Sequence, residues 1–534
     1  MRHFHLRSIC LYLVNILACT CVTACAAGDD KAGVSYVTGQ TVSGGNENAM
    51  TVIAVEGAYP VAGETDNAEA EEPIEASQAD TISLSEAGIH EECISLIEDI
   101  IEKDVENGFP SVQLAIMRDG KLVYENSWGR VNSYYPDGTR KYDSPEVTSD
   151  TLYDLASITK MAVVNYAIQK LVTDGEIDLD DKVASYLGDS FYKDVTEIPY
   201  NDGESCDLSV QQEWKASLTL KDLLKHEGGF PADPHYYDPN FDMVKLESSP
   251  DSVNILYAGN GADEETKEST IRQICRTPLL YEPGTRTLYS DVDYMILGVV
   301  VEQVTGTDLD TYFKETFCRP LGLTHLTYKP LEHGFMPDDC AATELNGNTR
   351  DGAVSIDGIR TYTLQGEVHD EKAYECMGGI SGHAGLFGNA VDLARLADLM
   401  LTGSYDGTQF FSQDVIDMFT APKSESVKKW GLGWWRQGDM ERARYFGSKA
   451  GESTFGHQGW TGTTIMIDPD KRIVIAYLTN KINTPLINSK ADPNKFAGSS
   501  YTSAYSGFVP EIIYTGLDKD TDVTRVLEEG GWLE

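Results

Sequence analysis

Two hairpin patterns near opposite ends of the chain constrain its fold most. The first covers residues 112–128 and turns at Asp119-Gly120, a pair that favours tight β-turns. The second covers residues 463–478 and turns at Pro469-Asp470. Between them, residues 176–420 contain mainly helical patterns separated by long polar loops. Hairpins at both ends of a helical middle predict an α+β fold, in which helices flank an antiparallel β-sheet and a mostly helical domain is inserted.

Four further segments complete the predicted secondary structure. A capping-box pattern at residues 83–86 precedes an apolar helical face. Residues 152–172 are predicted to form one largely apolar helix that ends at Gly175. A strand is expected at residues 431–435, and a last helix is expected near residues 509–517.

The charge balance excludes two classes of partner. The chain has 85 Asp and Glu residues against 42 Lys and Arg residues, a formal net charge of −43. Nucleic acids and anionic lipid surfaces are bound through clustered Lys and Arg, so neither is an expected partner. Hydrophobic residues make up 41% of the chain, which is enough for a sizeable core. We interpret the acidic excess as a source of solubility in an external medium.

The first 25 residues have the pattern of an export signal. Basic residues within 1–7 precede a mostly apolar stretch at 9–18, which is too short to span a membrane. Val22-Thr23-Ala24-Cys25 resembles a bacterial lipobox, in which the cysteine is lipidated and becomes the new N-terminus. We therefore expect residues 1–25 to be a lipoprotein-type signal peptide that exports the protein to the cell envelope, facing the periplasm or the cell exterior, with Cys25 lipidated. Plain secretory cleavage near Cys25 is the alternative.

The segment after the signal is predicted to be a disordered acidic tether. Residues 26–82 are rich in Gly, Ser, Ala and Glu and contain few large apolar side chains. Such a segment cannot bury enough surface to offset the entropy of ordering. The folded domain is expected over residues 83–525, with its sheet part at about 83–150 and 425–525 and its helical part at about 151–424.

The cysteines give no sign of a metal site. Six of the ten lie beyond the leader and are widely spaced, and the chain has neither a CxxC pair among them nor an HExxH motif. Six cysteines allow about 15 full pairings, so disulfides and isolated buried thiols both remain open. No metal or organic cofactor is expected.

One Ser-x-x-Lys match is distinguished by its surroundings. Ser157 and Lys160 open a segment that is apolar on nearly every side, whereas the matches at 190–193 and 426–429 lack such a context. A helix that is apolar all round is buried, so Ser157 and Lys160 should lie one turn apart at its N-terminal end. Burial and the helix dipole disfavour the ammonium, so Lys160 could be neutral and deprotonate Ser157 as it attacks a carbonyl. The alternative is a capping serine followed by a lysine whose amine reaches solvent.

Two later segments contain the other groups that a serine acyltransferase needs. Tyr289 and Asp291 precede a buried apolar helical run, and a phenol can serve as a second proton carrier. His457, Gly459 and Trp460 lie just before a strand. The edge of that strand can point a backbone amide at a developing oxyanion.

These motifs resemble those of the serine β-lactamase and penicillin-binding protein superfamily, in its class C-like and esterase branch. Longer strings, from about Pro110 to Val509, are similar to the type 4B penicillin-binding proteins, a group of periplasmic D-alanyl-D-alanine carboxypeptidases or esterases. The family's Ser-x-x-Lys, Tyr-x-Asn and Lys-Thr-Gly or His-x-Gly motifs fall, in order, on Ser157/Lys160, Tyr289/Asp291 and His457/Gly459. The similar strings are LYDLASITKM, LLKHEGGFPADP, YSDVDYMILG, ATELNGNTRDG, GEVHDEKA, GGISGHAGLF and GHQGWTGT.

The resemblance implies a β-lactamase/transpeptidase-like fold and a catalytic role for four residues. Ser157 would be the nucleophile and Lys160 its base. Tyr289 would bridge them and protonate the leaving group or activate water. The backbone N–H groups of Ser157 and Trp460 would form the oxyanion hole.

Substrate would lie against Asp291, His457 and Gly459, and two of these depart from the usual family pattern. Asp291 stands where Asn is usual, so it can accept a hydrogen bond from Lys160 but cannot donate one to a peptide-like substrate. Its anionic charge would also favour protonated Lys160, unless Tyr289 takes the role of base. His457 replaces the Lys of many relatives, which removes a fixed positive charge near neutral pH. Both changes favour esters or an atypical peptide over rapid β-lactam turnover.

Three other histidines carry weaker hypotheses. His383 could face the cleft, although a structural loop histidine is the preferred interpretation. His369-Asp370 and His226-Glu227 look like fragments of a metal site or triad, but no third partner stands at a recognisable spacing, so structural hydrogen bonds are expected. Ser381 is not expected to be a nucleophile, because His383 takes the last position of a Gly-x-Ser-x-Gly pattern.

Together these observations predict an exported, lipid-anchored serine hydrolase that acts through an acyl-Ser157 intermediate. On the strength of the resemblance, the expected substrate is a peptidoglycan stem peptide that ends in D-alanyl-D-alanine. β-Lactams would be covalent inhibitors, and the membrane would be contacted only through the N-terminal lipid. The alternatives are an esterase of small acyl esters and a non-catalytic lipoprotein that binds the cell wall.

Overall fold

A computed structural model describes residues 73–204, 207–438, 440–517, 522 and 525. The predicted signal peptide, Cys25 and the tether up to residue 72 lie outside the described residues. The described residues belong to one compact unit, which contains all the elements below.

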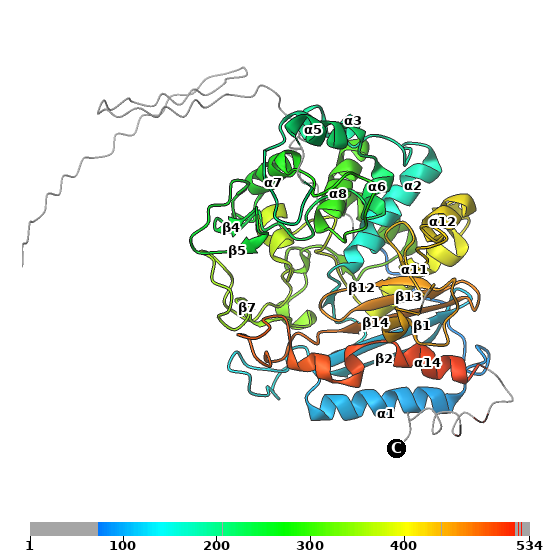
Figure 1. The fold of residues 1–534 in the computed structure, drawn as a ribbon. Coiled ribbons are helices and arrows are strands. Elements are labelled where there is room, and N and C mark those ends of the chain that lie inside the picture. The colour runs from blue at the N-terminus through cyan, green and yellow to red at the C-terminus, as the bar shows by residue number, and fades with distance from the viewer. Residues whose placement is uncertain (1–72, 205–206, 439, 518–521, 523–524, 526–534) are drawn as a thin grey trace, which may run out of the picture. The chain divides into compact units, whose positions relative to one another are not determined.

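A six-stranded antiparallel sheet contains both predicted hairpins, in the order β11-β12-β13-β14-β1-β2 (Figure 1). Strands β1 and β14 come from opposite ends of the folded chain, and they pair with Ala115 opposite Ala476. The two hairpins are therefore confirmed, and they meet within one sheet. The strands are β1 (Ser111–Arg118), β2 (Lys121–Gly129), β11 (Trp435–Arg436), β12 (Phe455–Gln458), β13 (Thr464–Asp468) and β14 (Ile473–Thr479).

Helices cover both faces of this sheet (Figure 1). Helices α1 (Glu91–Asn107) and α14 (Phe508–Thr515) pack together on one face and bury a separate apolar cluster there. Helix α11 (Ala390–Thr402) packs on β1, β13 and β14. Because of this double cover, β1 is buried along nearly its whole length. The predicted α+β fold is confirmed, and α11 packs on the sheet although its sequence lies within 151–424.

The strand expected at residues 431–435 is wrong except at its end, where β11 begins. Gly433 adopts a left-handed conformation (φ +75°), and a side chain there would overlap with the Tyr294 hydroxyl. The carbonyl of Leu432 accepts a hydrogen bond of 2.8 Å from Asn165. These contacts hold the segment as a loop against neighbouring helices, so it joins the sheet only at Trp435.

The first helix begins later than the capping-box pattern predicts. Ser83 and Glu86 do bond reciprocally, with Oγ of Ser83 accepting from the Glu86 N–H (3.2 Å) and the Glu86 carboxylate accepting from the Ser83 N–H (2.9 Å). The chain then turns at Gly88, whose φ is +65°. Helix α1 starts only at Glu91. The box therefore closes an isolated turn, which a local pattern cannot distinguish from a helix start.

Most of the remaining elements form the helical part of the unit, shown above the sheet in Figure 1. Its helices are α2 (Tyr166–Asp174), α3 (Ala184–Leu187), α4 (Ser190–Lys193), α5 (Leu208–Ser217), α6 (Leu220–Leu224), α7 (Glu264–Arg276), α8 (Asp291–Thr305), α9 (Leu309–Phe313), α10 (Arg319–Leu321) and α12 (Gln413–Thr420). The π-helical turns are η1 (Lys160–Asn165), η2 (Lys314–Cys318) and η5 (Lys372–Cys376). The short strands are β3 (Tyr153–Asp154), β4 (Phe241–Asp242), β5 (Glu247–Ser248), β6 (Leu326–Thr327), β7 (Leu345–Asn348), β8 (Phe387–Gly388), β9 (Ser404–Tyr405) and β10 (Thr408–Gln409).

Short helical turns complete the unit. They are η3 (Pro330–Glu332), η4 (Pro337–Asp339), η6 (Ala497–Ser500), η7 (Thr502–Ala504) and α13 (Ala443–Phe446). Among the helices in the described ranges, none has both the length and the apolarity that crossing a bilayer requires.

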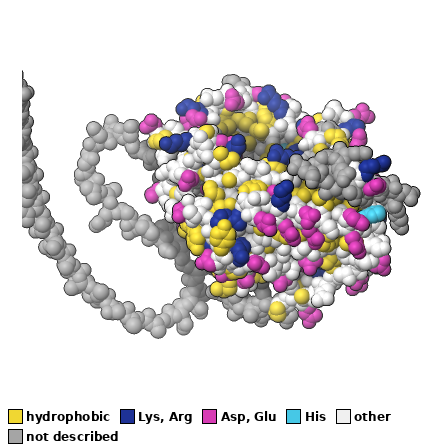
Figure 2. Space-filling view, turned by 90° about the horizontal axis from the view of Figure 1, so that it is seen from below, with side chains coloured by type: hydrophobic (Ala, Val, Ile, Leu, Met, Phe, Trp, Pro, Cys, Tyr) yellow, Lys and Arg dark blue, Asp and Glu magenta, His cyan; other side chains and the backbone are white. Residues whose placement is uncertain are grey.

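The described surface carries mixed charges, and the described cysteines are buried. On the face seen from below in Figure 2, Asp and Glu side chains are spread among Lys, Arg and hydrophobic side chains. Cys93, Cys318, Cys340 and Cys376 are buried free thiols, Cys275 is also buried, and Cys206 lies outside the described residues. The alternative of isolated buried thiols therefore holds for Cys93, Cys318, Cys340 and Cys376.

Candidate active site

Ser157 lies on a tight turn between β3 and the helix that follows. The helix predicted from residue 152 begins only after this turn, because Tyr153 and Asp154 pair with β8. Ala156 is held in the left-handed region (φ +46°), which a residue with a side chain rarely adopts. The Asp154 carboxylate fixes the turn by accepting a hydrogen bond of 2.8 Å from the Ala156 N–H. Backbone strain of this kind clusters at functional sites, and here it presents the half-buried Ser157 at the start of the helix.

Lys160 is fully buried and donates to three oxygen atoms. Its Nζ lies 2.9 Å from Oγ of Ser157, 2.9 Å from Oδ1 of Asp291 and 3.0 Å from the carbonyl oxygen of His383. Three acceptors match the three N–H bonds of an ammonium group. Burial acts to lower the pKa of Lys160, but the Asp291 carboxylate and Tyr289 together raise it above its usual value. The expectation of a neutral Lys160 is therefore wrong for the resting site, because a carboxylate from α8 compensates the burial.

Tyr289 completes the group, because its phenol lies close enough to Ser157 and Lys160 for each of them to lower its pKa. Nζ of Lys160 lies 5.0 Å from the centre of the Tyr289 ring. Burial raises the pKa of Tyr289 above its usual value, although the Lys160 charge opposes this shift. The phenol is therefore neutral in the resting site. Ser157, Lys160 and Tyr289 come together as predicted.

An aromatic wall holds the Tyr289 ring in place. Ring centres lie 4.5 Å away for His226, 6.1 Å for His457 and 6.3 Å for Trp430. Trp435 continues the wall, 4.9 Å from His457. Neither tryptophan belongs to a sequence motif, so neither was predicted to lie at the site.

Asp291 is the first residue of α8, and its two carboxylate oxygens each contact a lysine. Oδ1 contacts Lys160 as described, and Oδ2 lies 3.1 Å from Nζ of Lys372. Lys372 also pairs with Asp233. Burial acts to raise the pKa of Asp291, but the two lysines lower it below its usual value. Asp291 is therefore a carboxylate held between two cations.

His457 lies on β12 beside Tyr289 and is uncharged. Its Nδ1 donates to the carbonyl of Gln458 (2.8 Å), and its Nε2 has no hydrogen-bond partner among the described residues. Burial, helped by the Lys160 charge, lowers the pKa of His457 to about 3. This agrees with the predicted absence of a fixed positive charge at this position, but it moves the titration far below the usual value near 6.5.

The loop after β12 is hydrogen-bonded to the turn that carries Ser157. The Thr461 and Thr463 hydroxyls donate to the carbonyls of Asp154 (2.7 Å) and Leu155 (3.1 Å). A side chain at Gly459 would overlap with the Leu155 carbonyl, so only glycine allows this approach. Trp460 follows in the same loop with 42% of its surface exposed. The structure therefore places the Trp460 backbone on a loop that is fixed to the nucleophile turn.

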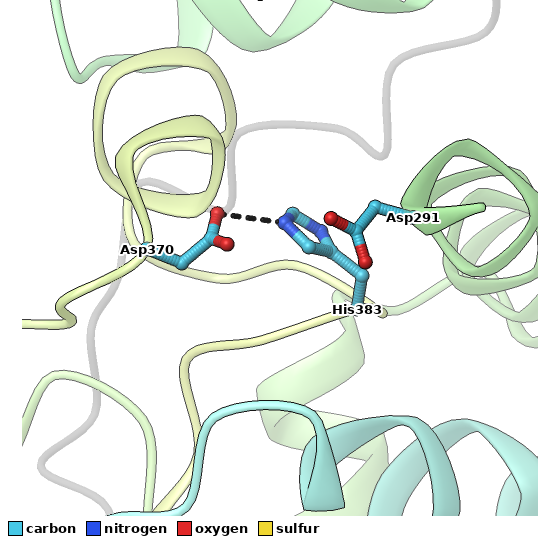
Figure 3. A group of neighbouring side chains, drawn as sticks. All are labelled: Asp291, Asp370 and His383. Atoms are coloured by element: carbon cyan, nitrogen blue, oxygen red, sulfur yellow. Dashed lines mark hydrogen bonds and ion pairs between the residues drawn. The ribbon is translucent and has the colours of Figure 1, made fainter. Parts of the chain in front are cut away.

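The preferred interpretation of His383 as a loop histidine with structural hydrogen bonds is confirmed, and the structure also brings its backbone to the site. Its carbonyl accepts from Lys160, and its ring bridges Oδ1 of Asp370 (2.8 Å) and Oγ of Ser381 (2.7 Å). Figure 3 shows the ring between Asp370 and Asp291, and possible ligand atoms of these three residues lie within 4.8 Å of one another. Both ring nitrogens are already hydrogen-bonded. Ser381 is buried, as expected for a residue that is not the nucleophile.

The other histidine fragments make structural hydrogen bonds. His226 Nδ1 lies 2.9 Å from Oδ2 of Asp293, not against Glu227, and this buried pair lies beneath the Tyr289 ring. Burial lowers the pKa of His226 and raises that of Asp293, so both are neutral. His369 Nε2 contacts Glu344 at 3.0 Å.

The two competing Ser-x-x-Lys matches have no comparable surroundings. Lys193 pairs with Asp189 on an exposed helix, and Lys429 pairs with Glu441. Neither lysine is buried beside its serine. The apolar context of Ser157 therefore separated the three matches correctly.

The chain is similar in sequence to several known proteins. The beta-lactamase family model matches residues 97–496. A protein of Escherichia coli (strain K12) named "Putative D-alanyl-D-alanine carboxypeptidase" is 42% identical over 437 residues, which is 82% of this chain and 93% of that protein. A protein of the same name from Salmonella agona is 39% identical over 440 residues, which is 82% of this chain and 94% of that protein.

Two solved structures are similar in fold. "EstCE1, a hydrolase with promiscuous acyltransferase activity" has a TM-score of 0.55 at 19% identity, covering 78% of this chain and 98% of its own. A penicillin-binding protein homologue from Caulobacter crescentus has a TM-score of 0.53 at 19% identity, covering 80% of this chain and 98% of its own. At this level of identity the likeness concerns the fold alone.

Proposed function

Because the chain belongs to the beta-lactamase family and is a serine hydrolase, we propose that it acts through an acyl intermediate on Ser157. The observation that carries the proposal is the contact of 2.9 Å between Oγ of Ser157 and Nζ of the buried Lys160, with the Tyr289 phenol beside both. A nucleophile, a proton acceptor and a proton carrier thus lie together in one group.

Lys160 and Tyr289 act together as the proton acceptor. Their protons are coupled, so the pair loses one proton with an apparent pKa that belongs to neither residue alone. The singly deprotonated pair takes the Ser157 proton as Oγ bonds to the substrate carbonyl carbon. It then returns that proton to the leaving alcohol or amine as the scissile bond breaks. Water attacks the acyl carbon in the second step, gives one proton to the pair, and releases the acid as Ser157 regains its proton.

Backbone amides stabilise the oxyanion formed in each step. The proposed donors are the N–H groups of Ser157 and Trp460, which lie on the nucleophile turn and on the loop stapled to it. Preorganised donors of this kind contribute about 10²–10³ in rate. His457 and Gly459 line the same side of the cleft.

We propose peptidoglycan stem peptides ending in D-alanyl-D-alanine as the substrate, with β-lactams as covalent inhibitors. The support is the name of two relatives that share about four-tenths of their residues with this chain over most of its length. A second candidate is a small acyl ester. It is favoured by Asp291, which offers a carboxylate and no amide donor, and by the uncharged His457.

Covalent labelling tests the nucleophile. A fluorescent penicillin and a fluorophosphonate should label the wild type and not Ser157→Ala, and equal labelling of the variant would refute the assignment. Release of D-alanine from a pentapeptide, compared with hydrolysis of a p-nitrophenyl ester, separates the peptidase from the esterase. Absence of both label and turnover would support the non-catalytic, wall-binding alternative.

We further propose that residues 1–25 direct export and that Cys25 carries the lipid anchor. The support is the Val22-Thr23-Ala24-Cys25 pattern after an apolar stretch. Radiolabelled palmitate should be incorporated into the full chain and not into Cys25→Ala. A wild type that is exported without label would instead support plain secretory cleavage.

A further inference from the structure

A second buried lysine lies directly behind the proposed catalytic group. Lys372 begins the η5 turn, and only 6% of its side chain is exposed. Its ammonium contacts Asp233 and lies 3.1 Å from Oδ2 of Asp291. Asp370 is a further negative neighbour and helps to raise the pKa of Lys372 well above its usual value. The positive charge that these three carboxylates surround therefore belongs to the Lys372 side chain.

Asp291 connects this lysine to the nucleophile. One carboxylate oxygen binds Lys160, which binds Ser157, and the other oxygen binds Lys372. The charges thus alternate along a line from Lys160 through Asp291 and Lys372 to Asp233. A carboxylate shared by two ammonium groups stabilises each of them less than it would stabilise one alone.

We propose that Lys372 is a positioning residue that holds the Asp291 carboxylate and shares its charge, so that the Lys160–Tyr289 pair can release a proton when Ser157 reacts. This inference rests on the function proposed above. Lys372 lies in the string GEVHDEKA, but no catalytic motif includes it, and the string has the polarity of an exposed loop.

The pairing also gives Asp291 a surrounding similar to that of an amide. An asparagine would present one neutral oxygen to Lys160 and carry N–H bonds on its other side. Asp291 presents one oxygen to Lys160, and Lys372 places N–H bonds against the other oxygen. Without Lys372, the full charge of Asp291 would face Lys160 and hold its proton more tightly.

Other titratable groups of the described chain also face Lys160 and Lys372. The titratable groups that face Lys160 are Asp291, Tyr289, His226, Asp293 and His457. The last three are neutral for the reasons given above. The titratable groups that face Lys372 are Asp233, Asp291, Asp370, Tyr236, Tyr237 and Cys376. His383 contacts Asp370, and His235 contacts Asp233 at 3.5 Å. These groups are unchanged in the Lys372 variants described next, so a shift specific to those variants reports the Lys372 charge.

The test measures the rate of Ser157 labelling by a fluorescent penicillin or fluorophosphonate between pH 5.5 and 9.5. Lys372→Met should move the midpoint of the rise with pH upward by about one unit, so labelling at pH 7 slows about tenfold. The rate on the alkaline plateau should be kept. Lys372→Arg keeps the charge and should leave the midpoint near that of the wild type.

A second variant shifts the same line of alternating charges in the opposite direction, and it changes an exposed residue instead of a buried one. The Asp233 side chain is 58% exposed, so Asp233→Asn should fold normally. It releases Lys372 to pair more fully with Asp291, and it removes a negative charge. The midpoint should therefore fall, and labelling at pH 7 should become faster.

Two controls separate the electrostatic role from general damage. Lys267 makes a buried ion pair of 3.0 Å with Glu302 that includes no residue of the site, so Lys267→Met should leave the pH midpoint unchanged. In the Asp291→Asn background, Lys372→Met should shift the midpoint much less, because the charge that it shares is gone.

The outcomes are distinct. Unchanged midpoints in both Lys372→Met and Asp233→Asn overturn the inference about Lys372, while labelling of the wild type leaves the proposed function standing. A wild type that is labelled at no pH overturns both. Opposite shifts in the two variants, with Lys372→Arg near the wild type, support the inference.

Discussion

Two lysines in this molecule are equally buried and have opposite protonation behaviour. Lys160 and Lys215 have no exposed surface, and each donates to three oxygen atoms. The acceptors of Lys215 are three backbone carbonyls at the end of α7, namely Ile274 (3.2 Å), Cys275 (2.6 Å) and Thr277 (3.1 Å). For Lys160, one of the three acceptors is the Asp291 carboxylate.

The side chains around Lys160, Asp291 first and Tyr289 second, account for the difference. Burial lowers the pKa of Lys215 to about 7, since carbonyl dipoles do not compensate the lost hydration. At Lys160 the same burial penalty is outweighed, and the pKa rises. The comparison shows that burial alone does not produce a neutral catalytic lysine. At Lys160 the Asp291 carboxylate and Tyr289 together shift the pKa more than burial does.

The largest expected effect comes from replacing Lys160, with the same replacement at Lys215 as the matched control. Lys160→Met should slow Ser157 labelling at pH 8 by about 10³-fold, because a proton acceptor of the nucleophile is lost. Lys215→Met should leave the rate of labelling within about threefold of the wild type, provided that the variant is folded. Labelling kinetics of the two purified variants, each checked by circular dichroism, give the measurement. Equal losses in both would contradict the division into a catalytic and a structural lysine.

The next largest effect is expected when Asp291, the charged partner of Lys160, is replaced. Asp291→Asn takes away the charge that holds the Lys160 proton, so the Lys160–Tyr289 pair should titrate at lower pH. Labelling by a penicillin at pH 7 should then rise about tenfold, and the amide adds a donor for a peptide-like substrate. A pH series of labelling rates checks both statements. No change, or a fall at every pH, would show that Asp291 is needed for another reason.

A third prediction concerns the stability that Lys215 controls. Its pKa is about 7 in the folded chain and near 10.4 when unfolded, so the unfolded state binds more protons between these values. The free energy of unfolding of the wild type should therefore rise with pH relative to Lys215→Met, from pH 7 toward pH 10. The slope should reach at most ~1.4 kcal/mol per pH unit. Urea unfolding of both proteins at pH 7, 8 and 9 measures it, and parallel curves would refute the shifted pKa.

The smallest expected effect is at His457. Because its pKa is about 3, His457 should not titrate between pH 5.5 and 8. His457→Gln should leave the shape of the pH–rate curve unchanged in this range, whatever its effect on the absolute rate. An inflection near pH 6.5 that disappears in the variant would show that the imidazole is solvated and takes part in the pH dependence.

Much of the site could be predicted because its chemistry is written in short local segments. Ser157 and Lys160 are separated by one helical turn, and the apolar residues after them already indicate burial. Tyr289 and His457 stand just before a helix and within a strand, where their side chains are held rigidly. Both hairpins were predictable for the same reason, since a β-turn and its flanking strands are contiguous.

The errors and omissions arose where a distant segment supplied the deciding contact. The strand at 431–435 is a loop because Gly433 packs against Tyr294. His383 enters the site because its carbonyl meets Lys160, and no pattern in a sequence specifies what a backbone carbonyl accepts. In the sequence Lys372 is one charge in a polar segment, and only the structure shows that it contacts Asp291 at the start of α8.

The sequence by itself determined the antiparallel sheet, the buried nucleophile helix and the identity of the reacting groups, because hydrophobic periodicity, turn residues and side-chain chemistry are local properties. Only the tertiary structure decided the protonation of these groups. The pKa of Lys160 depends on Asp291, and the charge of Asp291 is shared with Lys372, so the electrostatic state of the site is set by residues from three separate segments. Coulomb energies fall off with distance in space, and separation along the chain does not enter them.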